Sequence, residues 1–439
     1  MKFEFNHLEK SVLDSLSKKG RVYLVGGIVR DMVMYQKVDY HDVDVEIYDL
    51  EIDEIIDILS QYGKVNEVGK SFGILKLDCL PNFDFALPRI ERKKGQTHRE
   101  FEVEVHKDLD MKTACCRRDF TINAMMYDYQ NGKLIDYYQG REDIKNKCLK
   151  MVDEKTFYED PLRVLRLAQF MSRFEFQVDL KTKEICQKMV NEGVLQYLSL
   201  ERIQQEYNKL LMSSHPSTGL KFLLELNALI RPLETLVTCP QRLDFHPEGN
   251  VMNHTLLVVD LAALCKDKTS WPLAFMWSAL LHDIGKPVVA FQKNGKTVFY
   301  NHGKESRKIA EKRLPESGIE GSELKKILFY IEHHDDFISF KLKENIKEDK
   351  NGKVNPFIIP VTKENVEKKI HFVQKKCKEK GIYIPTVEDY KILMRLCYAD
   401  AMAQSPKVIE KGVQIDSVEE KVTRLKAVER MIEMILAER

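Results

Sequence analysis

Two aspartates one residue apart, Asp42 and Asp44, follow a glycine pair, Gly26 and Gly27. Carboxylates crowded on one face repel each other unless a cation lies between them, and oxygen ligands of this kind suit Mg²⁺, which also takes substrate phosphates as ligands. A glycine turn lets the backbone approach a bulky group such as a phosphate. In this order the two features are typical of phosphoryl or nucleotidyl transfer. A hairpin with a solvated acidic strand is the plainer alternative.

Two short strands are predicted to position these residues. Residues 21–25 are an apolar, β-branched run typical of a buried strand. Residues 43–48 alternate apolar and acidic side chains, as a half-buried strand does. Because side chains repeat every two residues along a strand, Asp42, Asp44 and Glu46 are expected to share one face.

A neighbouring hairpin supplies a further candidate. Residues 71–80 and 83–87 are predicted to be paired strands around a turn at Pro81 and Asn82. Asp84 lies on the second of these strands. It is a candidate third catalytic carboxylate.

Residues 117–124 crowd two cations, a carboxylate and an amide into one short segment. Arginine forks such as that of Arg118 suit triphosphate oxygens. Asp119 and Asn123 suit a ribose hydroxyl or a backbone turn. The start of a helix with surface charges explains the same pattern, since Asp and Asn are good helix caps.

A carboxylate and two guanidiniums recur at three-residue intervals near residue 160. Asp160 precedes Pro161, a residue favoured in the first turn of a helix, and Arg163 and Arg166 follow on the same helical face. Asp160 and Arg163 can meet a nucleobase edge while Arg166 holds phosphate. A capped helix with an internal ion pair is the alternative.

Length and composition limit the class of protein. A chain of 439 residues is expected to hold two or three domains. The formal net charge of +1 gives no global field for nucleic acid, so RNA binding must rest on local patches. The nine cysteines include no CxxC pair, which indicates reduced thiols in a cytoplasmic protein. An apolar signal region and an apolar run of 18 residues are both missing, so neither secretion nor a membrane span is predicted.

Three regions are expected along the chain. Residues 1–150 mix β-type runs with helices, residues 151–238 have helical periodicity, and residues 239–439 are helix-rich and carry histidines and aspartates. These patterns predict three regions, with a linker at residues 239–247.

The motifs GGIVRD, DVD, RRDFTINA and EDPLRVLR, in this order within residues 15–235, resemble those of class II tRNA nucleotidyltransferases (CCA-adding enzymes) and related bacterial poly(A) polymerases. The resemblance implies an α+β fold: a polymerase-β-type nucleotidyltransferase head, a mixed sheet with helices, followed by an all-helical neck. It implies that Asp42 and Asp44 bind catalytic Mg²⁺. It also implies that Asp160 and Arg163 select C or A as a protein template, with Glu159 orienting Arg163. The nucleotide-binding residues implied are Gly26, Gly27, Arg30, Arg118, Asp119, Asn123, Asp160, Arg163 and Arg166.

The basic segment 89–99 resembles the flexible loop of enzymes that add the terminal A, and it favours full CCA addition. An ordinary hairpin loop is the alternative.

The C-terminal third has a second signature, His282-Asp283-Ile284-Gly285-Lys286. With the surrounding histidines it resembles an all-helical HD-type phosphohydrolase domain over residues 245–439, with phosphatase, 2′-nucleotidase or cyclic phosphodiesterase activity. Nitrogen and carboxylate ligands suit Mn²⁺, Ni²⁺, Co²⁺ or Fe. The metal ligands implied are His254, His282, Asp283 and Asp400, with His302 and either His333 or His334 completing a second position.

The leading hypothesis is an enzyme that adds CCA to the 3′ end of tRNA from CTP and ATP and hydrolyses phosphoesters in its HD domain. A poly(A) polymerase, or a CC-only or A-only enzyme, would have the same fold. A non-catalytic RNA-binding or regulatory protein is the third hypothesis. The partners expected are tRNA, CTP and ATP, with neither membrane nor DNA, and the oligomeric state stays open.

Overall fold

The structure is a computed structural model that describes residues 3–36, 40–68, 73–93, 101–241, 243, 246, 248–346, 354, 358–379, 383–403 and 418–437. Its internal contacts divide the chain into two compact units, Met1–Leu198 and Ser199–Arg439. Of the basic segment 89–99, which was expected to be a loop, residues 94–99 lie outside the described residues.

A seven-stranded sheet forms the centre of the first unit, in the order β3-β4-β5-β2-β1-β8-β9. Its strands are β1 (Arg21–Val25), β2 (Val43–Tyr48), β3 (Val65–Val68), β4 (Ile74–Leu77), β5 (Leu80–Ala86), β8 (Met126–Asp128) and β9 (Lys133–Ile135). Only β2 and β5 are parallel neighbours, and the other pairs are antiparallel. A separate hairpin joins β6 (Arg89–Lys93) to β7 (Phe101–Val105). The predicted mixed sheet is confirmed.

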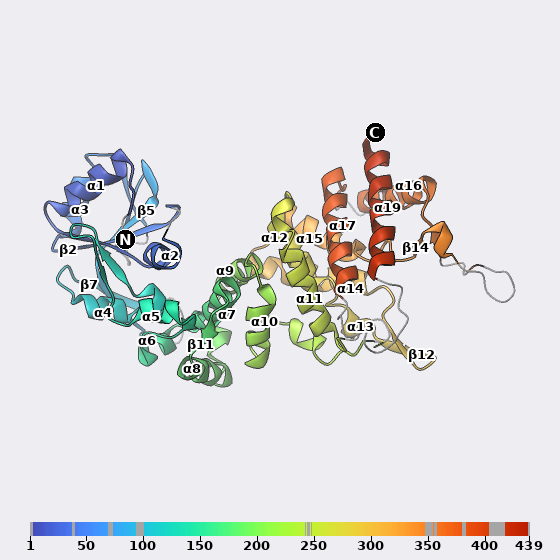
Figure 1. Ribbon diagram of the computed structural model, residues 1–439, viewed down its shortest axis with the longest axis horizontal. Helices are drawn as coiled ribbons and strands as arrows, with labels where there is room; N and C mark the ends of the chain where they lie inside the picture. Colours follow the sequence, from blue (N-terminus) through green and yellow to red (C-terminus); the bar gives the residue numbers. More distant parts are fainter. Residues whose placement is uncertain are drawn as a thin grey trace. The chain divides into compact units, whose positions relative to one another are not determined.

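Both faces of this sheet are covered, because side chains on its two faces belong to two different apolar clusters. Helices α1 (His7–Ser17) and α3 (Ile52–Leu59) lie together against the sheet in Figure 1, and α1 begins with a capping box between Asn6 and Glu9. Side chains of β1 point alternately to the two faces of the sheet. Val22 and Leu24 belong to the large core on one face, and Tyr23 and Val25 belong to a smaller cluster on the other. Helix α2 (Gly27–Tyr35) packs on β1 and β2.

The turn of the second hairpin differs from the prediction. Leu77 of β4 pairs with Leu80 of β5, so the chain reverses at Asp78 and Cys79, and Pro81-Asn82 lie inside β5. The register shifts between Lys76 and Leu77, so the β5 residues Pro81, Asn82 and Phe83 have no partner in β4. A proline, which cannot donate a ladder hydrogen bond, is accommodated at such an irregularity.

Helices dominate the rest of the chain, as predicted. The first unit contains α4 (Met111–Cys116), α5 (Gly140–Lys145), α6 (Glu154–Glu159), α7 (Leu162–Phe174) and α8 (Leu180–Asn191). The second contains α9 (Leu200–Leu211), α10 (Pro216–Glu225), α11 (Val251–Ala263), α12 (Pro272–Leu281), α13 (Lys286–Val289), α14 (His302–Arg313), α15 (Gly321–His333), α16 (Lys363–Glu379), α17 (Val387–Met402) and α19 (Val418–Ala437). It also contains two short strand pairs, β12–β13 (Phe291–Lys293, Lys296–Val298) and β14–β15 (Phe340–Lys341, Ile359–Pro360).

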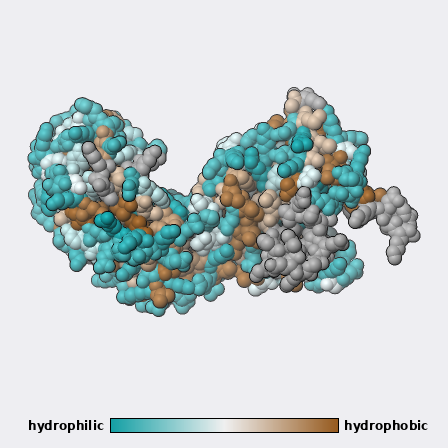
Figure 2. Space-filling view, in the orientation of Figure 1, coloured by the Kyte–Doolittle hydropathy of each residue, from teal (hydrophilic) through white to brown (hydrophobic). Residues whose placement is uncertain are grey.

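On the face seen in Figure 2, hydrophilic side chains cover most of the coloured surface, and hydrophobic side chains gather in smaller areas. Among the described helices, none combines the length and apolar character needed to cross a bilayer.

Candidate active sites

The paired carboxylates meet on neighbouring strands of the first unit. Asp44 of β2 is aligned with Asp84 of the parallel strand β5, and Asp42, exposed, lies just before β2. Lys76 Nζ is 2.7 Å from Asp84 Oδ1. Burial raises the pKa of Asp44, Arg118 opposes this, and the nearby Asp42 and Asp84 reinforce it. Carboxylates that repel in this way fit a divalent cation bound between them.

Glu46, the third acidic residue of the predicted face, is already neutralised by protein groups. Its Oε1 lies 2.8 Å from Arg117 Nη2 and 3.3 Å from Arg118 Nη2, and the side chain is buried. Burial would raise its pKa, but the two guanidiniums outweigh this and lower it. Of the three acidic residues of this face, Asp42 and Asp44 therefore remain to bind a cation.

Gly26 brings the N-terminus of α2 against Asp44. Its φ of +73° is in the left-handed region, and a Cβ built on it would lie 2.9 Å from Asp44 Oδ2 and 3.0 Å from Arg118 Nη1. A Cβ on Gly27 would meet only Arg30, at 3.5 Å, which is ordinary contact. The first N–H groups of a helix suit phosphate oxygens, so a phosphate can approach this turn beside the carboxylates.

A buried chain of hydrogen bonds links α2 to α7 through the RRDFTINA segment. Arg30 Nη1 donates to Asn123 Oδ1 at 2.8 Å, and Asn123 Nδ2 donates to Asp119 Oδ1 at 2.9 Å. Arg166 of α7 then lies 2.6 Å from Asp119 Oδ2 through Nη2. Burial would raise the pKa of Asp119, but Arg166 and Asn123 hold it at about 2. Arg30 is 4% exposed, so it supports this network from within the protein.

The start of α7 places the remaining predicted residues beside the same segment. Asp160 Oδ1 accepts from the Leu162 N–H at 3.2 Å, and the assigned helix begins at Leu162. Arg163 donates to the backbone carbonyl oxygens of Arg117 and Arg118. The predicted residues of the head and neck therefore converge within the first unit, on β2, β5, α2, α7 and residues 117–124.

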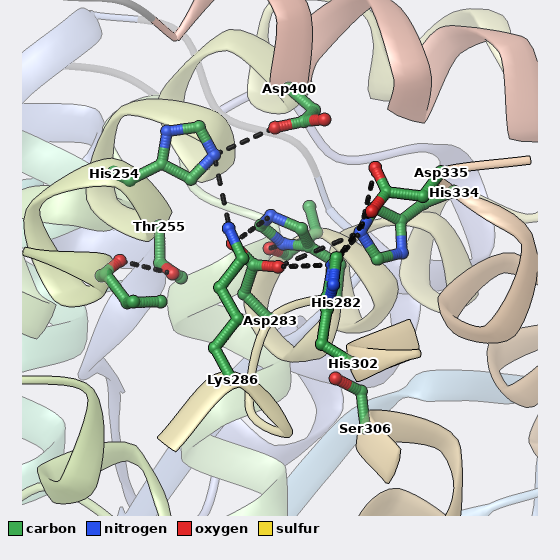
Figure 3. A network of polar contacts seen from close by, with 12 residues as sticks. His254, Thr255, His282, Asp283, Lys286, His302, Ser306, His334, Asp335 and Asp400 are labelled. Atoms are coloured by element: carbon green, nitrogen blue, oxygen red, sulfur yellow. Dashed lines mark hydrogen bonds and ion pairs between the residues drawn. The ribbon is translucent and has the colours of Figure 1, made fainter. Parts of the chain in front are cut away.

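A second cluster in the second unit gathers histidines and aspartates from α11, α14 and α17 and from the C-terminal ends of α12 and α15 (Figure 3). His254 Nε2 of α11 lies 2.8 Å from Asp400 Oδ1 of α17 and 4.0 Å from Asp283 Oδ2. Asp283 Oδ1 lies 3.2 Å from His302 Nε2 and 3.7 Å from His334 Nε2. His282 Nε2 is 3.2 Å from Asp283 Oδ2. These residues include two overlapping groups of potential metal ligands.

The orientation of the imidazoles fits metal binding. The Nδ1 atoms of His282, His302 and His334 lie 2.9, 2.9 and 2.7 Å from backbone carbonyl oxygens, where each can only donate. A neutral imidazole that carries its proton on Nδ1 has a lone pair on Nε2, and in these three residues Nε2 faces the cluster. His302 Nε2 and His334 Nε2 are only 3.1 Å apart. Two lone pairs this close repel each other unless a cation or a proton lies between them. The donor set therefore fits divalent metal.

Of the two adjacent histidines, the structure brings His334 into the cluster and turns His333 elsewhere. His333 Nδ1 lies 2.6 Å from Asp336 Oδ2, and its ring packs against Phe329.

Three further residues of this site were not predicted from the sequence. Asp335 Oδ2 lies 3.0 Å from His302 Nε2, and Lys286 Nζ lies 2.6 Å from Asp283 Oδ2. Glu248 Oε1 lies 2.9 Å from His254 Nδ1 and orients that ring. Asp335 follows the predicted ligand His334, and Lys286 is the last residue of the HDIGK motif, so their positions in the sequence are the signal that could have found them.

Gly285 allows the HDIGK segment to pack closely on α14. A Cβ there would lie 2.4 Å from the Ser306 backbone nitrogen and 2.6 Å from the His302 carbonyl oxygen. The glycine therefore helps to bring Asp283 and His302 together. A cavity of about 390 Å³ opens onto the cluster and is large enough for a small ligand.

Three family models match the chain. They are described as the poly A polymerase head domain, over residues 22–150, a probable RNA- and SrmB-binding site of polymerase A, over residues 175–233, and the HD domain, over residues 251–354.

Curated relatives share the name "Multifunctional CCA protein". The one from Aromatoleum aromaticum is 40% identical over 270 residues, which are 61% of this chain and 63% of that protein. The one from Shewanella frigidimarina is 34% identical over 298 residues, which are 66% of this chain and 68% of that protein. The alignment thus spans slightly less than two thirds of the length of the Aromatoleum aromaticum protein.

Solved structures share the fold at lower identity. A "tRNA-processing enzyme (apo form I)" matches with a TM-score of 0.55 and 19% identity, covering 99% of this chain and 100% of that one. A tRNA nucleotidyltransferase complexed with a primer tRNA and an incoming ATP analog matches with a TM-score of 0.54 and 20% identity, covering 95% and 99%. Together with the length and identity of the Shewanella frigidimarina match, the three domain matches place this chain in the family of multifunctional CCA proteins.

Proposed function

We propose that this chain adds C, C and A to the 3′ end of tRNA from CTP and ATP, and that its second unit hydrolyses phosphoesters. The observation that carries the first activity is the alignment of Asp44 with Asp84 beside Gly26 and Arg118. The proposed division of labour is a nucleotidyltransferase head at 1–150, a helical neck at 151–238 that selects the base and binds RNA, and an HD domain at 239–439.

In the head, Asp42 and Asp44 hold Mg²⁺ and Asp84 completes the catalytic carboxylates. Bound Mg²⁺ supplies Lewis-acid stabilisation of the charge that develops on phosphate oxygens and on the RNA 3′-hydroxyl. Gly26 and Gly27 admit the triphosphate to the N-terminus of α2, and Arg118 neutralises it. Asp119, fixed by Asn123, meets the ribose, while Arg166 serves both Asp119 and phosphate. Arg30 keeps Asn123 and Asp119 in place.

Base selection is assigned to Asp160 and Arg163. Cytosine N4 and adenine N6 are both hydrogen-bond donors next to a ring-nitrogen acceptor, which a carboxylate and a guanidinium can satisfy together. Uracil and guanine present the opposite pattern, a carbonyl oxygen beside a ring N–H, so these hydrogen bonds to the charged groups would be lost, at a cost of about 1.5–3 kcal/mol each. Contacts to tRNA come through phosphates and shape.

In the second unit, the metal ligands proposed are His254, His282, Asp283, His302, His334 and Asp400, with Asp335 added from the geometry. Mn²⁺, Ni²⁺, Co²⁺ or Fe suits these nitrogen and oxygen donors. A cation bound there supplies Lewis-acid chemistry to a phosphoester and to water. Lys286 holds Asp283, and Glu248 holds His254 in the tautomer that presents Nε2 to the cluster.

The experiment is an addition assay on tRNA lacking its 3′-terminal CCA, with Mg²⁺ and CTP alone, ATP alone, or both. Growth by C, C and A that then stops supports the proposal. Long tails from ATP alone would move the function to poly(A) polymerase, the activity named in the description of the head-domain family. A stop after CC would identify a partial enzyme, and no addition would reject a nucleotidyltransferase.

A further inference from the structure

A hairpin of β12 and β13 lies at the edge of the second unit, between the HDIGK motif and His302 (Figure 1). Asn294 and Gly295 form its turn with φ values of +52° and +71°, as a two-residue hairpin turn requires. Across the strands, Gln292 Nε2 donates to Thr297 Oγ1 at 2.9 Å. The turn and this bond fix the pairing of the hairpin, yet the proposed activities use none of its residues.

One face of the hairpin carries two aromatic rings and two lysines. Lys293 is paired directly with Lys296, and Phe291 with Val298. Because side chains alternate along a strand, Phe291 shares a face with both lysines. Tyr300 extends this face, since its ring centroid lies 5.6 Å from that of Phe291 and 5.3 Å from Lys293 Nζ. Both lysines are exposed, and Phe291 and Tyr300 are 46% and 55% exposed. We call these four residues the hairpin face.

The local charge of this face is positive. Two like charges directly opposite each other in a hairpin destabilise it, and an anion between them removes that cost. The segment between Asp283 and Glu305, all of which the structure describes, has four lysines and no acidic residue. One of the four, Lys286, lies 2.6 Å from Asp283 Oδ2. The segment therefore offers no carboxylate to Lys293 and Lys296, and a negatively charged ligand fits them.

The hairpin face continues into the cavity at the histidine–aspartate cluster. Val298, Tyr300 and His302 all line that cavity of about 390 Å³, and His302 is also part of the cluster. Tyr300 thus belongs both to the exposed face and to the wall of the cavity. A chain that lies along the hairpin can place its end at the cluster.

Exposed aromatic rings beside lysines suit single-stranded nucleic acid, because bases stack on the rings while phosphates meet the ammonium groups. A double helix keeps its bases stacked on each other and offers no free base to the rings. An acidic protein segment would use the lysines and leave the rings unexplained. Unpaired nucleotides are therefore the ligand that accounts for the whole face.

We propose that the hairpin face binds the unpaired end of an RNA chain, with bases stacked on Phe291 and Tyr300 and phosphates at the two lysines. The substrate that the second unit prefers is then an RNA end rather than a mononucleotide. This preference rests on the proposed hydrolytic function, whereas binding of RNA to the face does not.

The first test compares two substrates with the same reacting group, using the full chain loaded with Mn²⁺. They are adenosine 2′,3′-cyclic phosphate and a short single-stranded RNA ending in a 2′,3′-cyclic phosphate. Phe291→Ala should raise KM for the RNA about tenfold with kcat unchanged, because one stacked base is lost. It should leave both constants for the mononucleotide unchanged, because Phe291 is not among the residues that line the cavity.

Phe372 of α16 provides a matched control. Its side chain is 50% exposed, and Lys376 Nζ lies 4.2 Å from its ring centroid, so it has the same residue type, a similar exposure and a similar cation contact. Phe372→Ala should change neither substrate. Equal effects of the two Phe→Ala variants on the RNA, or equal effects of Phe291→Ala on both substrates, would overturn the proposal.

The two lysines are tested through salt. Each phosphate contact that is lost should lower the slope of log KM for the RNA against log salt by about 0.7. Lys293→Ala and Lys296→Ala should each show this decrease, and neither should change the mononucleotide kinetics. An unchanged slope in both variants would contradict a role of these lysines in binding phosphate.

A cross-linking measurement separates this proposal from the hydrolytic one. A short RNA with 5-bromouridine near its 3′ end, irradiated with the wild-type protein, should give adducts on the hairpin face, and the same sequence in a duplex should not. If the wild type hydrolyses neither substrate, the hydrolytic function fails, and the adducts still decide whether the face binds RNA. Adducts confined to other segments, or competition by an acidic peptide as strong as by unlabelled RNA, would overturn the proposal.

Discussion

Gly26 was predicted to let the backbone approach a phosphate, and the structure shows that no larger residue fits there without strain. Its positive φ strains any side chain, and a Cβ would press on Asp44 Oδ2 and Arg118 Nη1, the two groups proposed to hold metal and triphosphate. We therefore expect Gly26→Ala to lower kcat/KM for CTP addition at least tenfold, with about 1 kcal/mol or more of lost stability from the backbone strain. Gly193→Ala, which has a similar φ of +70° but a Cβ that would meet only Gln196, at 3.7 Å, is the matched control. Steady-state incorporation kinetics measure both, and equal losses would contradict the account.

Asp119 gives a prediction with a pH dependence. Its folded-state pKa of about 2 is below the unfolded value of 3.8, because Arg166 and Asn123 outweigh the effect of burial. A depressed carboxyl pKa contributes stability that is fully present above the unfolded pKa and is lost as pH falls through about 4 toward 2. The shift corresponds to about 2 kcal/mol.

Asp119→Asn should therefore reduce the free energy of unfolding by about 2 kcal/mol at pH 7, and the difference from wild type should shrink by pH 3. Urea denaturation at the two pH values measures this. A difference that stays constant with pH would show that the Arg166 pair does not set the effect.

At the scale of elements, helices α15 and α17 are joined by a buried polar network. Asp389 Oδ1 accepts from Lys326 Nζ at 2.9 Å and from the Tyr330 hydroxyl at 2.8 Å, and its other oxygen caps the first turn of α17 at Thr386. Lys326 is 7% exposed. Its loss would leave a buried carboxylate without its cation.

We expect Lys326→Ala to cost about 3–5 kcal/mol of stability. Lys325→Ala, the exposed neighbour on the same helix, should stay within about 0.5 kcal/mol of wild type. Chemical denaturation compares the two variants, and similar free energies of unfolding would mean that the network does not hold α15 to α17.

The sequence predicts a helix or strand well where the residues that determine it are close together in the chain. The alternation of residues 43–48 and the proline after Asp160 are local signals, and they predicted β2 and the start of α7. The turn between β4 and β5 was predicted at Pro81-Asn82 because proline and asparagine are common in turns. Its true position, at Asp78 and Cys79, depends on the register between the two strands, which the local sequence does not show.

The choice between His333 and His334 also required the fold. The two side chains differ by about 100° around the end of α15, and only the packing of the surrounding helices shows that the second one faces the cluster. Likewise, Glu46 resembles a metal ligand by its spacing and differs from Asp44 only through its contacts with Arg117 and Arg118.

At the scale of the whole molecule, the two candidate sites lie in different compact units. Asp42, Asp44 and Asp84 are in Met1–Leu198, and the histidine–aspartate cluster is in Ser199–Arg439. The two donor sets also differ in kind: oxygen ligands suited to Mg²⁺ in the first, and nitrogen with oxygen ligands suited to transition metals in the second. The proposed activities should therefore be separable by substitution and by metal.

Metal exchange should separate them. After chelation and dialysis, Mg²⁺ alone should restore nucleotide addition, while phosphoester hydrolysis should need Mn²⁺, Ni²⁺, Co²⁺ or Fe. Addition and hydrolysis are measured on the same preparation after each metal is supplied. Full recovery of hydrolysis by Mg²⁺ alone would show that the second cluster does not have the metal preference proposed.

The most direct measurement is to sequence the 3′ ends produced from one truncated tRNA by wild type, Asp42→Ala and His282→Ala, and to follow phosphoester hydrolysis in the same samples. The account predicts that wild type adds CCA and stops and that Asp42→Ala adds nothing yet still hydrolyses. His282→Ala should add CCA normally and no longer hydrolyse. Loss of both activities in either variant, with the fold retained, would contradict two separate sites, and wild-type ends other than CCA would contradict the proposed reaction.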